Sequence, residues 1–145
     1  HSFAPGETWE LSTDIFVSTC LFPHPGQNCG YRLQTSGKNK LCYISDIENT
    51  GATTLEDVIA FNKDSACLII DSSYTKEEMK SRKGWGHLSL GDVEFIAKAL
   101  PHVTIFMYHH DIFKSDNQIE TDSKLLLSTC RNVRLAQQFD EIQLA

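Results

Sequence analysis

The sequence predicts an α/β fold, in which a β-sheet packs against helices. Strand-like segments follow one another in the first third of the chain, and the remainder alternates strands and helices in the order βαβαβ. Two of the later segments, residues 66–70 and 103–108, are uninterrupted apolar runs, which are typical of strands buried in a sheet. With 145 residues, the chain is long enough to form one domain with a substantial core.

The first third of the chain reads as strands joined through turns. It becomes strand-like soon after its start, and residues 17–22 are apolar enough for a strand that the Pro-His-Pro-Gly sequence of residues 23–26 ends. Apolar and polar side chains alternate in residues 31–35, and the Ser-Gly-Lys-Asn sequence of residues 36–39 predicts a turn. Residues 41–44 then continue as another strand.

Two of these strands lead to side chains that can bind a metal. His24 lies in the constrained loop after the first, and Asp46 lies just past the strand at residues 41–44. Loops at strand ends are where a scaffold presents chemical groups, and an imidazole with a carboxylate is a reasonable pair of metal ligands. Turn histidines and aspartates are also common surface residues, and that alternative stays open.

The middle of the chain predicts a helix, a buried strand and a charged segment. A threonine caps a short helix within residues 53–62, which has acidic residues in its first turn. The apolar run of residues 66–70 ends in Asp71, and its lack of alternation predicts a strand covered on both faces. Residues 75–82 form a short charged helix or turn, which the glycine-containing residues 84–87 interrupt.

The last third predicts two helices and two strands. Ser89 caps a helix over residues 90–100, whose apolar side chains recur on one face, and a proline follows it. Residues 103–108 form the second apolar strand. A long helix begins at residue 115 or 116 and ends near residue 132, and residues 139–144 predict a terminal strand.

Polar side chains therefore follow several strands of the predicted sheet. Asp46, Asp71 and His109 each come at a strand end, and His24 follows the first long strand. Open α/β sheets place their active sites at such strand ends. These side chains also have structural explanations: Asp71 caps the residues after it, and His110-Asp111 is a solvated turn.

Composition limits the classes of function. The formal net charge of −6 argues against a general binder of the nucleic-acid backbone. Five cysteines, an odd number without any Cys-x-x-Cys spacing, suit reduced thiols. No signal peptide is visible in the sequence, and its apolar runs are too short to span a membrane. We therefore expect a cytoplasmic protein with no membrane partner and no general affinity for nucleic acid.

The ordered set of motifs resembles the second half of a metallo-β-lactamase-fold hydrolase. Within that superfamily it is most similar to the phosphodiesterase branch that includes ribonuclease Z, over roughly residues 14–144. The motifs that carry the resemblance are His24-Pro25-Gly26, Gly30-Tyr31-Arg32, Tyr43-Ile44-Ser45-Asp46, Asp71, Gly86-His87-Leu88-Ser89, His109-His110-Asp111 and Ser115-Asp116.

The resemblance implies an architecture and a set of roles. Residues 1–145 would form half of an αββα sandwich, a mixed sheet with helices on one face. His24 would bind the first of two divalent ions, zinc or manganese, Asp46 would bridge both, and His109 would bind the second. His87 would donate a proton to the leaving oxygen, with Asp71 as its partner. The alternative for His87 is a turn histidine stacked on a neighbouring tryptophan.

The sequence departs from the family in one respect. The principal metal-binding motif of the family, His-x-His-x-Asp-His, is absent, so each metal would have only two ligands from this chain. A catalytic zinc normally has three protein ligands and one open position. We therefore expect an incomplete site in this chain alone, with or without a bound metal in isolation.

Two functions follow from this departure. The first is the C-terminal portion of a metal-dependent phosphodiesterase that acts on a small, cyclic phosphodiester and is completed by the missing N-terminal half or a second copy. The second is a non-catalytic structural or interaction half-domain. Helices can cover only one face of the apolar strands, so we expect an oligomer or a partner on the other face. Arg32 and Lys114 either attract an anionic substrate or are solvated.

Overall fold

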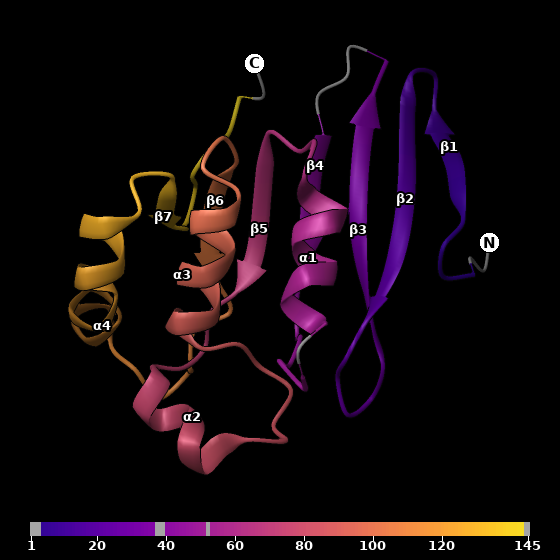
Figure 1. The fold of residues 1–145 in the computed structure, drawn as a ribbon. Helices are drawn as coiled ribbons and strands as arrows, with labels where there is room; N and C mark the ends of the chain where they lie inside the picture. Colours follow the sequence, from indigo (N-terminus) through magenta and orange to yellow (C-terminus); the bar gives the residue numbers. More distant parts are fainter. Residues whose placement is uncertain (1–3, 37–39, 52, 144–145) are drawn as a thin grey trace.

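The chain forms a seven-stranded sheet whose strands lie in sequence order (Figure 1). The computed structural model describes residues 4–36, 40–51 and 53–143. The turn predicted at residues 36–39 falls mostly outside these residues. The strands are β1 (Thr8–Ser12), β2 (Ile15–Phe22), β3 (Asn28–Thr35), β4 (Lys40–Ile44), β5 (Cys67–Asp71), β6 (Thr104–Tyr108) and β7 (Val133–Leu135).

The directions of the strands bring several strand ends together. The strands β1 to β4 pair antiparallel, whereas β4, β5, β6 and β7 pair parallel. Two antiparallel steps separate β2 from β4, so these two strands run in the same direction. The carboxyl ends of β2, β4, β5 and β6 therefore lie along one edge of the sheet, and each predicted site residue on a strand end comes to that edge.

Three helices cover one face of the sheet (Figure 1). These are α1 (Thr54–Asn62), α3 (Leu90–Ala99) and α4 (Asp116–Thr129), while the short α2 (Lys76–Arg82) lies beyond the strand ends. Ser89 and Ser115 begin their helices with capping boxes, in which the side chain of the cap and that of the third helical residue satisfy each other's backbone N–H groups. The predicted α/β architecture with helices on one face is confirmed.

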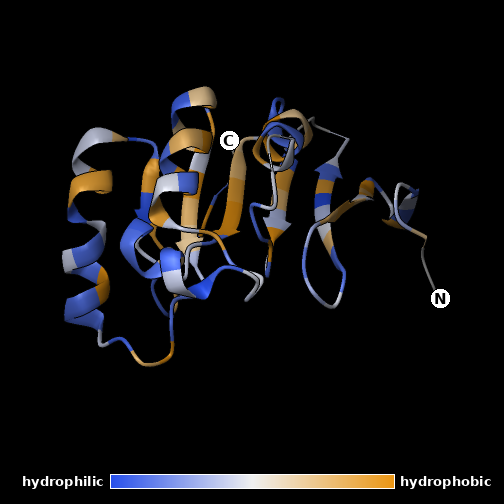
Figure 2. Ribbon diagram, turned by 60° about the horizontal axis from the view of Figure 1, so that its bottom comes forward, coloured by the Kyte–Doolittle hydropathy of each residue, from blue (hydrophilic) through white to orange (hydrophobic). Residues whose placement is uncertain are grey.

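The core lies between the helices and one face of the sheet. Its central side chains are fully buried and come from β4, β5, β6, α1 and α3: Ile44, Leu68, Ile70, Ile105, Met107, Val58, Val93 and Ile96. Figure 2 shows the central strands as hydrophobic and the helices as banded, with polar residues on their outer sides. The apolar periodicity of the helices therefore faces the sheet, as predicted.

The opposite face of the sheet carries a row of large side chains that the helices do not cover. Tyr31, Tyr43, Ile69 and Phe106 lie side by side across β3 to β6. Tyr31 is 41% exposed and Tyr43 38% exposed, and the other two are partly exposed. Within residues 66–70, Cys67 is buried and Ile69 is partly exposed on this face, so the predicted cover on both faces is only partial in this chain. We refer to these four side chains as the open face.

The C-terminal elements differ from the prediction. The helix α4 ends at Thr129 and not near residue 132, because Cys130 adopts an extended backbone. The last strand is β7, and residues 139–143 contain no strand; residue 144 lies outside the described residues. Val133 is buried and pairs beside Ile105, whereas Phe139 is 91% exposed and has no neighbouring strand to pair with.

The cysteines, all of which lie within the described residues, form no disulfide bonds in the structure. All five thiols are free, and those of Cys42, Cys67 and Cys130 are buried. Burial raises the pKa of Cys42 and of Cys67 to about 11. Within the described part of the chain, no helix has the length and apolar character needed to cross a membrane.

Candidate metal and acid–base site

The site lies where three neighbouring parallel strands end. Asp46 follows β4 by two residues, Asp71 is the last residue of β5, and His109 directly follows β6. Asp46 and His109 have positive φ values of 47° and 58°, which are uncommon for residues other than glycine. Such a backbone costs about 1–3 kcal/mol and is concentrated at functional sites. The surrounding structure therefore holds both side chains in a conformation that the local sequence does not favour.

Four side chains meet at this edge of the sheet. Each of Asp46, Asp71, His87 and His109 offers an atom that can bind a metal, and these atoms all lie within 4.8 Å of one another. Nε2 of His109 is 3.2 Å from Oδ1 of Asp46, and its Nδ1 is 3.8 Å from Oδ2 of Asp71. We call these residues the Asp/His cluster. Four of the five residues singled out from the sequence therefore come together.

His87 and Asp71 form a close pair inside this cluster. Nδ1 of His87 lies 2.7 Å from Oδ2 of Asp71, whose side chain is fully buried. A carboxylate only accepts, so Nδ1 of His87 carries a proton and donates it to this bond. The hydrogen bond raises the pKa of His87 above its ordinary value, although burial of the ring opposes the shift. The pair therefore favours the protonated imidazole.

Asp71 also organises the loop that follows it. Its Oδ1 accepts hydrogen bonds from the backbone N–H of Ser73, at 3.1 Å, and from the hydroxyl of Ser73, at 3.0 Å. The structural explanation that the sequence left open for Asp71, a cap for the next residues, is thus present together with the contact to His87. Oδ1 of Asp71 therefore binds the loop at Ser73, and Oδ2 binds the imidazole of His87.

His24 lies beside the Asp/His cluster and is not one of its members. Its Nδ1 is 3.1 Å from the carbonyl oxygen of Gly86, and its ring centroid is 6.3 Å from that of His87. A carbonyl only accepts, so Nδ1 of His24 is the protonated nitrogen and Nε2 keeps its lone pair. Histidine ligands usually donate their second ring N–H to a carbonyl or carboxylate in this way.

Glu48 has a role that was not predicted from the sequence. Its buried carboxylate accepts hydrogen bonds from the backbone N–H groups of Gly84, at 2.5 Å, and Gly86, at 3.0 Å. These two glycines begin the loop that presents His87 and contacts His24. Glu48 therefore joins the end of β4 to the His87 loop across a sequence distance of 36 to 38 residues. Its place two residues after Asp46 was the one available signal.

The alternatives for the histidines can now be compared with their surroundings. The ring of His87 stacks on that of His109, with centroids 5.0 Å apart, while Trp85 contacts Tyr74. His110 points elsewhere: its Nδ1 is 3.4 Å from the hydroxyl of Ser72, and burial lowers its pKa. His109, and not His110, is therefore the histidine beside Asp46.

The residues present suit a zinc or manganese ion in kind, but not in number. Imidazole nitrogen and carboxylate oxygen are the ligands that both metals accept. With His87 in its predicted role of proton donor and Asp71 as its partner, the groups left for a metal are Asp46, His109 and Nε2 of His24. Three such groups shared between two ions fall short of the three protein ligands that each catalytic zinc normally has.

Comparisons with known proteins support the fold. No protein-family profile matches the chain, and a search of curated proteins found no match. Among solved structures, Zn²⁺-bound PqqB from Methylobacterium extorquens has a TM-score of 0.74 at 16% identity, covering 99% of this chain and 55% of that one. The metallo-β-lactamase fold protein YhfI from Bacillus subtilis has a TM-score of 0.68 at 18% identity, covering 94% and 52%. The short form of human tRNase Z has a TM-score of 0.67 at 16% identity, covering 95% and 47%.

These identities are low, so the likeness concerns the fold. The chain spans about half the length of the solved structures that it matches, from 47% to 55% for these three. The seven-stranded mixed sheet, with its helices on one face, aligns along nearly the whole of this chain. The chain therefore has the fold of roughly half of a metallo-β-lactamase-fold protein.

Proposed function

We propose that this chain is the part of a metal-dependent phosphodiesterase that supplies its proton donor and three of its metal ligands. The observation that carries the proposal is the stack of His87 on His109, with centroids 5.0 Å apart. This stack places the imidazole of His87, whose pKa is raised, beside Asp46 and His109. A proton donor adjacent to a metal site is what hydrolysis of an ester with a poor leaving group requires.

The roles of the residues follow from their bonds. His24 through Nε2, Asp46 through its carboxylate and His109 through Nε2 would hold the metal. A divalent metal held there would supply polarisation of a phosphoryl oxygen and activation of a water molecule. Nδ1 of His87 is held by Asp71, so Nε2 is the atom from which His87 donates a proton to the departing oxygen. Asp71 orients the ring and keeps it protonated at higher pH.

The proposed enzyme needs a complementary half that brings further ligands. The three groups available here are too few, and the four large side chains of the open face are partly exposed. Burying a side chain of this size is worth about 1.5–3 kcal/mol. The fold matches about half of each solved structure. We propose that the complementary half of the domain, which supplies the His-x-His-x-Asp-His ligands, packs on the open face.

The substrate we propose is a small phosphodiester. The net charge of −6 disfavours a long polyanion such as RNA. Arg32, one of the two cations considered for substrate binding, instead donates to the carbonyl of Phe61 at 3.3 Å and lies over its ring. A small ester with one negative charge requires less basic surface than a nucleic acid does.

The proton donor is tested in the assembled protein with His87→Ala. We expect turnover of a phosphodiester to fall about 10²–10⁴-fold, with metal content unchanged. His102→Ala is the matched control, because His102 is exposed and bonds only to a backbone carbonyl of Lys63 among the contacts of the described residues. Loss of metal from His87→Ala would make His87 a ligand. Absence of hydrolysis and of metal in the assembled wild type would instead favour a non-catalytic interaction half-domain.

Association is tested by analytical ultracentrifugation of the purified chain, alone and with a complementary half. We expect the chain alone to self-associate or precipitate, and the mixture to form a one-to-one complex. The proposed pairing would be contradicted if the chain remains a stable, monodisperse monomer and does not bind the complementary half. A defined dimer of the chain alone would assign the open face to a second copy.

A further inference from the structure

A cleft beside His87 and His109 has features that neither the metal site nor the proton donor explains. Its volume is about 250 Å³, and both histidines line it together with Tyr74, Trp85 and Phe113. The cleft therefore opens directly on the atoms that would carry out the reaction. A substrate group that projects from the phosphorus on this side would contact the walls of the cleft.

One wall is a loop that exposes two large apolar side chains on a fixed backbone. Ile112 is 88% exposed and Phe113 is 87% exposed. The loop is nevertheless held, because Oδ1 of Asp111 accepts from the backbone N–H of Phe113 at 3.0 Å, and Oδ2 accepts from Arg82 at 2.8 Å. The side chain of Asp111 is only 8% exposed. The exposure of Ile112 and Phe113 is therefore built into the fold and does not come from a loose segment.

The other wall is an aromatic surface that reaches the proton donor. The ring of Tyr74 packs edge-on against Trp85, at 6.4 Å, and against His87, at 5.6 Å. The guanidinium of Arg82 lies 4.5 Å from the Tyr74 ring centroid and 5.8 Å from that of Trp85. Trp85 is still 59% exposed. This surface can accept a flat ring without rearrangement.

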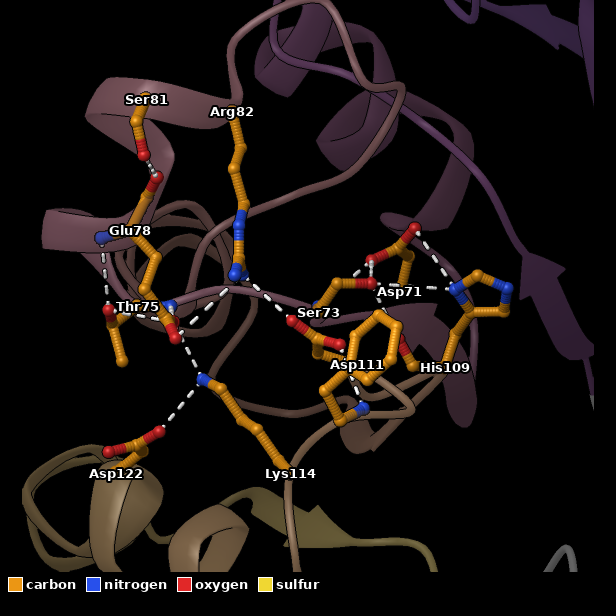
Figure 3. Close-up of polar contacts among 11 residues, drawn as sticks. Asp71, Ser73, Thr75, Glu78, Ser81, Arg82, His109, Asp111, Lys114 and Asp122 are labelled. Atoms are coloured by element: carbon orange, nitrogen blue, oxygen red, sulfur yellow. Dashed lines mark hydrogen bonds and ion pairs between the residues drawn. The ribbon is translucent and has the colours of Figure 1, made fainter.

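The cations near the cleft are already neutralised (Figure 3). Arg82 contacts Asp111 at 2.8 Å and Glu78 at 3.8 Å. Lys114 contacts Glu78 at 2.6 Å and Asp122 at 2.8 Å. Each cation is thus shared by two carboxylates, so the cleft offers no excess positive charge to a second phosphate. Charge and shape together favour a neutral, planar group.

We propose, resting on the proposed function, that this cleft binds a neutral aromatic ring on the leaving-group side of a small phosphodiester. Trp85 and Phe113 are its specificity-determining residues. In the reaction, a hydroxyl from water bonds to phosphorus and the water's other proton passes to solvent. The bond from phosphorus to the oxygen of the aromatic alcohol breaks, and that oxygen takes the proton of His87, which regains one from solvent.

Two phosphodiesters of equal charge test the cleft without any catalysis. Diphenyl phosphate and dimethyl phosphate are titrated into the ¹⁵N-labelled, metal-free chain, and amide and indole chemical shifts are followed. We expect diphenyl phosphate to bind at least about 10-fold more tightly, with the largest shifts at Trp85 and Phe113. Equal binding of the two esters, or shifts confined to other surfaces, would overturn the proposal.

Variants assign the preference to the two rings. Trp85→Ala and Phe113→Ala should each weaken diphenyl phosphate binding about 5- to 10-fold and leave dimethyl phosphate unchanged. Phe95→Ala is the matched control, because Phe95 is 50% exposed on α3 and does not line the cleft. If the spectrum of Trp85→Ala or of Phe113→Ala shows misfolding, Ile112→Ala is used in place of that variant. An unchanged preference for diphenyl phosphate in the Trp85 and Phe113 variants would count against the assignment.

The outcomes also separate this proposal from the proposed function. The titration needs no metal and no turnover, so aromatic preference stands even if the assembled protein proves inactive. Conversely, if the assembled protein is active but binds diphenyl phosphate and dimethyl phosphate equally, the proposed function stands and the aromatic specificity is wrong. If Phe113→Ala abolishes association with the complementary half and leaves ester binding unchanged, the loop is a protein contact and the proposal is wrong.

Discussion

Nδ1 of His87 lies 2.7 Å from a carboxylate oxygen of Asp71, and Asp71 is fully buried at the end of β5. The two residues are 16 positions apart in the sequence: Asp71 is the last residue of β5, and His87 lies in the loop between α2 and α3. The bond stabilises the charged imidazole, because a buried carboxylate next to the ring favours the protonated form more than burial disfavours it. The protonation state of His87 therefore depends on Asp71.

The first prediction is that Asp71→Asn lowers the pKa of His87 in the metal-free chain. A histidine whose folded-state pKa is raised stabilises the fold in full below its unfolded value of 6.5, and this stabilisation is lost as pH rises through the folded-state pKa. The stability advantage of wild type over Asp71→Asn should therefore shrink on going from pH 6 towards pH 8. NMR titration of the His87 ring and denaturant unfolding at several pH values measure both effects.

The control for this prediction removes one negative charge elsewhere. Asp57→Asn, at an exposed position in the first turn of α1, should leave the His87 titration unchanged. A pKa of His87 that does not move in Asp71→Asn would mean that Asp71 holds the loop of Ser73 and does not tune the imidazole.

The second prediction concerns Glu48. Replacing it with Gln puts an amide NH₂ in place of one of the two oxygens that now accept from the backbone N–H groups of Gly84 and Gly86. One backbone N–H group then faces another donor, and an unsatisfied buried donor costs about 1–3 kcal/mol. We expect Glu48→Gln to destabilise the chain by this amount and to speed hydrogen exchange at the amides of Gly84 and Gly86. Glu56→Gln, an exposed position on α1, is the control and should do neither. Unchanged exchange at both glycines would contradict the role of Glu48.

The third prediction compares two glycines of the same loop. Gly84 and Gly86 both have φ near 90°, at 89° and 87°, so an alanine at either site costs about 1–2 kcal/mol in backbone strain. A Cβ at Gly84 meets nothing within 4 Å, whereas one at Gly86 would lie 2.3 Å from the ring of His24. Gly86→Ala should therefore be the more destabilising change in denaturant unfolding, and it alone should shift the NMR signals of the His24 ring.

An equal loss of stability in the two variants would show that the loop moves away from His24 at little cost. The imidazole would then not be held by the carbonyl of Gly86, and its Nε2 would have no fixed direction. A larger loss in Gly84→Ala than in Gly86→Ala would contradict the packing of the loop on His24 altogether.

The parts of the fold that the sequence predicted well are those encoded locally. The helices α2 and α3 begin at Thr75 and Ser89, whose capping boxes lie within four residues. The apolar strands β5 and β6 are buried in the centre of the sheet, and their ends carry Asp71 and His109. Because parallel strands end at the same edge, the approach of these side chains follows from topology and could be anticipated.

The features that the sequence did not predict depend on distant partners. A terminal strand was expected at residues 139–144, but a strand also needs a neighbour, and β6 pairs with β7 at Val133 instead. Glu48 acts on glycines 36 and 38 residues away. The neutralisation of Lys114, in the loop before α4, likewise depends on Glu78 in α2. No local pattern records such contacts.

The last prediction tests whether the backbone strain at His109 serves binding and not stability. His109 has a φ of 58°, and Gln27, in the loop between β2 and β3, has a φ of 62°. Glycine relieves about 1–2 kcal/mol of strain at such positions. Gln27→Gly should therefore raise the free energy of unfolding by about 1 kcal/mol without affecting metal binding. His109→Gly gains the same relief but loses a ring that is 39% exposed, so we expect stability equal to or above wild type. In the assembled protein, however, its zinc affinity measured by calorimetry should fall at least about 10-fold. A loss of more than about 1 kcal/mol in His109→Gly, with zinc affinity intact, would make His109 a structural residue.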